Sequence, residues 1–160
     1  MQPFNKFTNK AQEALMKAQE IAFERRQQLD SLHILAAFAR QESGVVVLIL
    51  EKLSIETESF KRRIEEMLDV EPKSNVTPAF GQVYMSQELG LVFERAFQIA
   101  SELKDDYISV EHIFLAFFDV PSKAQKIIID KFRLSKEETM KILAELRGAQ
   151  KVSDADPESK

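Results

Sequence analysis

Two histidines, His33 and His112, are the only imidazoles in the chain, and each directly precedes an apolar run. A pair of imidazoles can bind a metal ion or respond to pH near neutrality. Two ligands with no further partners nearby make a poor metal site, so no metal is expected. We favour packing and hydrogen bonding at the start of a helix as the role of both histidines.

A second group of polar residues, Asp105, Asp106 and Glu111, gathers carboxylates within seven positions of the sequence. Carboxylates this close can accept a cationic group such as a guanidinium. Residue types alone favour a simpler interpretation, in which they are solvated loop acids and one carboxylate favoured near a helix N-terminus. The basic runs 25–26 and 61–63 are balanced by neighbouring glutamates, which is typical of solvated helix faces.

Motifs for catalysis are absent from the sequence. The 160 residues contain no phosphate-binding glycine loop, no dinucleotide-binding glycine pattern and no His-Glu-x-x-His motif. Without cysteine there is no disulfide framework, thiolate metal site or thiol nucleophile. These observations predict a non-catalytic module.

Composition restricts the partners and the location of the chain. Apolar residues make up 44% and charged residues 30%, as in a soluble globular protein. Residues 1–71 hold 10 basic and 12 acidic side chains, and 84–147 hold 9 and 11, so neither half has the basic excess that nucleic-acid binding needs. The longest apolar run, 45–50, is too short to cross a membrane, and no secretory pattern precedes it. A cytoplasmic protein that binds neither nucleic acid nor membrane is expected.

The segments that carry these residues occur twice in the chain. A shift of 78 places Thr8 on Ser86, and a shift of 79 places His33 on His112. The shift changes because the second copy has one residue more, between Ala100 and His112. Such a repeat defines the unit of folding before any single element is assigned.

Each copy is predicted to contain four helices. Thr8 and Ser86 are the expected N-caps of the first helix of each copy, and Asp30 and Ser109 those of the second, over 31–41 and 110–119. The segment Val45–Leu50 taken alone could form a buried strand, but its repeat partner has helical spacing, so both are predicted as helices. The last helices are expected at 57–68 and 136–147.

The predicted fold is therefore all-α, with eight helices in one compact domain of pseudo-two-fold symmetry over 1–148. Its parts are repeat one (1–70), a linker (71–83) and repeat two (84–148). The polar segment 149–160 is expected to be a flexible tail or interdomain linker.

The segments 7–15, 32–35 and 107–113 resemble the duplicated N-terminal domain of the Clp ATPases, which are AAA+ unfoldases. The tail 146–160 resembles the segment that joins this domain to the first ATPase ring in ClpB and ClpC proteins. The resemblance implies a monomeric piece of a homohexameric, stress-response machine that disaggregates proteins or feeds a protease. It implies no cofactor in these residues, with ATP and magnesium bound beyond Lys160.

In that family the domain captures unfolded or aggregated polypeptide, or docks an adaptor protein, and delivers the client to the ring. The resemblance implies that Thr8, Asp105 and Glu111 contact the client. In ClpC-type domains a glutamate at the position of Glu111, with a repeat-related glutamate, receives phosphorylated arginine. Here the repeat partner of Glu111 is Leu32, as in ClpB, while Glu111-His112 resembles ClpC, so both types stay open.

An alternative hypothesis is a free-standing regulatory protein that competes with the unfoldase for adaptors. The reading frame beyond Lys160 distinguishes the two, since a stop codon favours the regulator and a nucleotide-binding motif favours the unfoldase. The linker-like tail favours the unfoldase.

Overall fold

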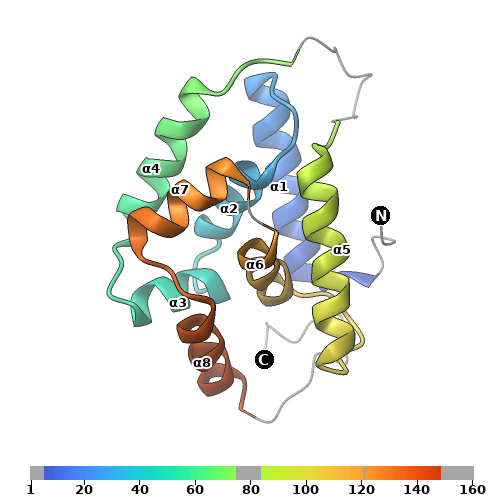
Figure 1. The fold of residues 1–160 in the computed structure, drawn as a ribbon. Helices are drawn as coiled ribbons and strands as arrows, with labels where there is room; N and C mark the ends of the chain where they lie inside the picture. The colour runs from blue at the N-terminus through green and yellow to red at the C-terminus, as the bar shows by residue number, and fades with distance from the viewer. Residues whose placement is uncertain (1–5, 75–83, 121, 149–160) are drawn as a thin grey trace.

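The computed structural model describes residues 6–74, 84–120 and 122–148, and within them the chain folds into eight helices without a strand (Figure 1). In chain order the helices are α1 (Asn9–Arg25), α2 (Ser31–Ala39), α3 (Val45–Lys52), α4 (Thr57–Val70), α5 (Gln87–Glu102), α6 (Val110–Asp119), α7 (Lys123–Phe132) and α8 (Lys136–Arg147). The predicted all-α fold with four helices in each copy is confirmed. The tail 149–160 and most of the predicted linker lie outside the described residues.

The predicted caps begin the first two helices of each copy. The Thr8 hydroxyl accepts from the backbone N–H of Ala11 at 3.2 Å, and the Ser86 hydroxyl accepts from that of Leu89 at 3.1 Å. Asp30 and Ser109 each form a capping box in which the third helical residue is a histidine. Each box satisfies backbone N–H groups that a helix start otherwise leaves unpaired.

Two short backbone pairings join the first copy to the second. Phe7, before α1, pairs with Ile108, before α6, and Leu29, before α2, pairs with Met85, before α5. The Thr8 N–H donates to the Ile108 carbonyl at 2.9 Å. Each copy thus supplies the backbone partner for the other, which gives the pseudo-two-fold arrangement.

The core lies around α2 and α6. Every residue of α2 is buried, and α6 is buried from Val110 to Phe117 except for Glu111. Helix α1 packs against this centre through a stripe of small residues, which allows a close approach. The buried members of that stripe are Ala11, Ala14, Leu15, Ala18, Ile21 and Ala22.

The segment from Val45 is helical, as its repeat partner predicts. Val46, Ile49 and Leu50 are buried in α3, at the spacing of one helix face, and Val47 and Leu48 are partly exposed. No helix within the described residues is long and apolar enough to cross a membrane.

Candidate functional site: a charged cluster in the second copy

The three residues predicted to contact clients come from neighbouring places in the fold. Asp105 lies in the turn between α5 and α6, and Glu111 lies in the first turn of α6. Thr8 is joined to the same turn through its backbone bond to Ile108, and its side chain is buried at the start of α1. Their role in binding stays a prediction.

An arginine from α8 brings the two carboxylates together. The Arg147 guanidinium contacts Asp105 Oδ1 through Nη2 and Glu111 Oε1 through Nη1, the latter at 3.3 Å. The Asp105 side chain is 0% exposed, against 13% for Glu111 and 19% for Arg147. The interpretation as solvated loop acids is wrong for Asp105, because α8 covers it, and holds for the exposed Asp106. The acids accept a guanidinium, and it belongs to the same chain.

His112 ties this cluster to the start of α6. Its Nδ1 accepts from the Ser109 backbone N–H at 2.8 Å, so the ring proton lies on Nε2 and is donated to Asp105 Oδ2 at 2.8 Å. Burial lowers the pKa of His112 below its ordinary value, which keeps the ring neutral at pH 7. The histidine holds a helix start, as predicted, and also orients the Asp105 carboxylate.

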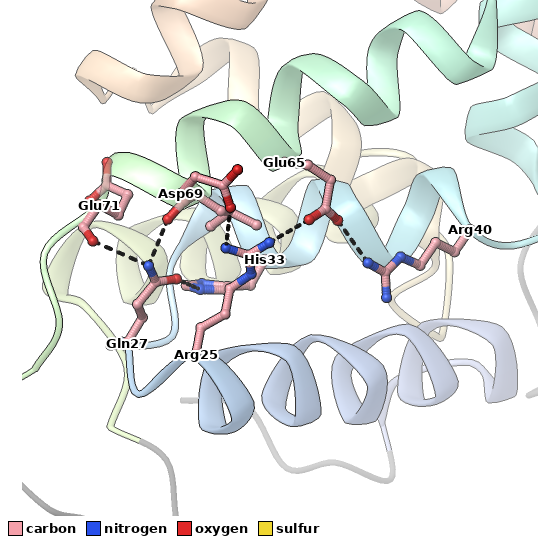
Figure 2. A network of polar contacts seen from close by, with 8 residues as sticks. Arg25, Gln27, His33, Arg40, Glu65, Asp69 and Glu71 are labelled. Atoms are coloured by element: carbon pink, nitrogen blue, oxygen red, sulfur yellow. Dashed lines mark hydrogen bonds and ion pairs between the residues drawn. The ribbon is translucent and has the colours of Figure 1, made fainter.

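The first copy builds the same frame with a neutral glutamine in place of the aspartate that the histidine contacts. The His33 Nδ1 accepts from the Asp30 N–H at 3.0 Å, and Nε2 donates to Gln27 Oε1 at 3.0 Å. Gln27 in turn donates to the carbonyls of Leu68 at 2.8 Å and Glu71 at 3.3 Å, at the end of α4 (Figure 2). Burial lowers the pKa of His33 to about 4.

Backbone bonds show which residues of the two copies correspond. The Gln27 N–H donates to the Ala22 carbonyl at 2.9 Å, and the Asp105 N–H donates to that of Ala100 at 2.8 Å. Gln27 and Asp105 are therefore equivalent under a shift of 78, and the added residue of the second copy lies after Asp105. This narrows the predicted range for the insertion, and it makes Asp106 part of the lengthened turn.

Three equivalent positions are neutral in the first copy and charged in the second. Gln27 corresponds to Asp105, and under a shift of 79 Leu32 corresponds to Glu111 and Leu68 to Arg147. The neutral set lines a surface pocket of about 230 Å³ in the first copy. The charged set forms the Arg147 cluster in the second. Sequence reasoning missed Arg147, although the same comparison of repeats contained the signal.

Arg25 departs from the expected solvated face. Its guanidinium contacts Asp69 at 2.9 Å and Glu65 at 2.5 Å, and Arg40 contacts Glu65 at 2.7 Å (Figure 2). This network joins α1 and α2 to α4 in the first copy. Arg26, the second residue of the predicted basic run, is exposed.

Asp105, Glu111 and His112 also bring potential metal-ligating atoms within 4.8 Å of one another. Oxygen and nitrogen donors of this kind suit several divalent metals. However, Arg147 already contacts both carboxylates, and His112 donates its Nε2 proton to one of them. A metal ion would have to displace a guanidinium and a proton, so we assign no metal to the cluster.

The fold and the cluster define a class of protein. It is a duplicated helical domain whose two copies are joined by short backbone pairs, and one copy carries a charged cluster. The Clp repeat (R) N-terminal domain family matches residues 6–130. The chain belongs to this family, whose domain is non-catalytic, as the absence of catalytic motifs predicted.

Two curated relatives are ClpB chaperone proteins. The protein from Nitratidesulfovibrio vulgaris is 38% identical over 96% of this chain, and the one from Clostridium tetani is 37% identical over 96%. The chain spans 18% of the length of each relative. The similarity therefore concerns one domain of a much longer protein.

Solved structures confirm the fold. The Hsp104 N-terminal domain from Candida albicans matches with a TM-score of 0.81 and 27% identity, over 94% of this chain and 97% of that one. A ClpV N-domain solved in complex with a VipB peptide matches with a TM-score of 0.68 and 18% identity, over 88% and 86% of the two chains. At that identity the second match is evidence of shared fold.

Proposed function

We propose that this chain is the client- or adaptor-binding N-terminal domain of a ClpB-type ATPase, and that the second copy carries the binding site. Family membership and the ClpB relatives support a ClpB-type ATPase as the parent protein. A related fold solved with a VipB peptide supports polypeptide as the ligand. The observation that carries the proposed site is the charged cluster of Asp105, Glu111 and Arg147, which the first copy replaces with neutral residues.

The surroundings of the cluster suit an unfolded polypeptide. Leu103, two residues before Asp105, is 39% exposed, and Leu146, beside Arg147, is 40% exposed. An unfolded client offers apolar side chains together with cationic and amide groups, but no fixed sequence. The partly exposed Glu111 carboxylate, together with these exposed leucines, offers a partner for each kind of group. A contact of this small area favours weak, rapidly reversible binding, as delivery requires.

The remaining features of the parent protein follow from the family. A homohexameric ring would bind ATP and magnesium outside these residues, draw the client into its pore and rescue aggregated protein in the cytoplasm during stress. This domain would capture the client and transfer it. Isolated, it should hydrolyse no ATP.

A titration with a labelled, denatured client tests the proposed site. Glu111→Gln should weaken binding about 10-fold, because it replaces a charged acceptor with a neutral one of the same shape. The matched control is Glu65→Gln, which also removes a carboxylate from an arginine pair, but in the first copy. The control should bind as wild type does. Equal affinity of all three proteins would exclude Glu111 from the site.

A further inference from the structure

We propose that the contact between the two copies is selective, so that each copy pairs with the other and not with a second copy of its own kind. The face that either copy buries in this contact thus fits only the opposite copy as its partner. Two contacts between the copies carry this inference, one through polarity and the other through size. In both, the repeat places different residue types at the equivalent positions.

The polar contact joins α2 of the first copy to α7 of the second. The Ser31 hydroxyl donates to Gln125 Oε1 at 2.8 Å, and both residues are 1% exposed. The Gln125 amide is held in one orientation, because its Nε2 donates to the carbonyls of Phe117 at 2.9 Å and Val120 at 2.6 Å. Its oxygen is thereby held toward the first copy, and this buried acceptor depends on the donor there.

The equivalent positions in α3 and α6 are apolar. A shift of 79 places Val46 on Gln125. The same shift places Ser31 on Val110, and both valines are buried. Helices α3 and α6 contact each other, as α2 and α7 do. Two first copies in the same arrangement would therefore place Ser31 against Val46. Two second copies would place the Gln125 oxygen against Val110, which offers no donor from its side chain.

A second contact between the copies adds a match of size. The Phe60 ring in α4 packs against the Phe132 ring in α7, with the ring centroids 5.2 Å apart and 51° between the ring planes. Under the shift of 79 these rings correspond to Thr139 and Leu53, which are both smaller. Two second copies would place Phe132 against Thr139 and leave space unfilled in the core, which lowers stability.

The two mismatches favour the native pair. In a symmetric pair of like copies each contact occurs twice, so each mismatch would occur twice as well. A buried polar group without a partner costs more free energy than a typical hydrogen bond contributes. The native pair avoids this cost, because polar meets polar at one contact and apolar residues occupy the other. Selective pairing therefore gives every domain one neutral frame and one charged frame.

Cutting the chain between its copies tests whether they select each other. A specific protease site is introduced between Ser74 and Tyr84, and the folded chain is cut there. The two halves are then unfolded in urea and refolded together, and native mass spectrometry measures the pairs. Pairs of one first and one second copy should outnumber pairs of like copies about 10-fold or more. A statistical mixture of pairs, or separation of the halves on cutting, would overturn the proposal.

Two reciprocal variants of the cut protein separate selection from simple stabilisation. Both Ser31→Val and Gln125→Met remove the same hydrogen bond from the native pair. Ser31→Val also removes the mismatch between two first copies, so pairs of first copies should increase. Gln125→Met removes the mismatch between two second copies, so pairs of second copies should increase instead. Ser31→Thr keeps the hydroxyl and should pair as wild type does. The same change in pair distribution for both variants would overturn selection by polarity.

A double-mutant cycle in the uncut protein decides the question if the halves refold poorly. The single variants are Ser31→Ala and Gln125→Met, and thermal unfolding gives the Tm of each and of the double variant. The double variant should lose less in Tm than the two single losses added together, because the second change finds no hydrogen bond left to remove. Losses that simply add would overturn the contact as a basis for selection.

Discussion

Replacing Asp105 with alanine is expected to lower the free energy of unfolding by about 3 kcal/mol, because removing one partner strands the others of a buried ionic cluster. Arg147 loses its buried acceptor, and the Nε2–H of His112 loses the carboxylate to which it donates. The small exposure of Arg147 places the expected value at the lower end for buried pairs. Urea denaturation followed by circular dichroism measures it.

The matched variant is Asp105→Gln, which copies the first repeat. Gln27 accepts from the equivalent histidine through its amide oxygen, so a glutamine at 105 has a defined way to satisfy His112. Glu111 remains to pair with Arg147. The free energy of unfolding of Asp105→Gln should fall by less than half as much as that of Asp105→Ala. Equal losses for the two variants would show that the hydrogen bond to His112 contributes little.

Lowering the pH from 7 to 5 is expected to cost about 2 kcal/mol of stability through His33 alone. Burial lowers the pKa of this ring to about 4 in the folded protein, against an ordinary value of 6.5. As the pH falls below about 6.5, His33 binds a proton in the unfolded chain while it stays neutral in the folded chain. The contribution of the neutral His33 to stability is therefore fully present above about pH 6.5 and is lost progressively toward pH 4. His112, with its pKa also lowered, adds to the loss in the same direction.

The control for this effect is His33→Gln. A glutamine at this third helical position can still accept from the Asp30 N–H, as in the usual capping box, but it does not titrate. Urea midpoints measured between pH 4.5 and 7.5 should fall less steeply toward acid for this variant than for wild type. Parallel curves for the two proteins would contradict the assignment to His33.

Much of the fold was predictable from local signals that agree with one another. Thr8 and Ser86 precede stripes of small and apolar residues, so cap and periodicity indicate the same helix start. The segment from Val45 was ambiguous alone, and its repeat partner decided it. Duplication doubles the information for each element, because both copies must satisfy one fold.

The site was less predictable because it depends on contacts between distant segments. Arg147 and Asp105 are 42 positions apart in the sequence, and no local pattern predicts that they pair. Asp105 lies in a loop, where acids are usually solvated, and only the packing of α8 buries it. The departure of Leu32 from Glu111 was visible in the sequence, and extending that comparison to Leu68 and Arg147 would have found the third member.

We propose that client binding depends on the charge of the second copy and not on its fold. The most direct test converts the cluster to the residues of the first copy, as Asp105→Gln, Glu111→Leu and Arg147→Leu together. Because these residues already serve the same frame in the first copy, the variant should fold with a helical spectrum like that of wild type. Affinity for denatured client, measured by fluorescence anisotropy, should fall about 10-fold or more. Wild-type affinity in the folded variant would show that the charged cluster is not needed for client binding.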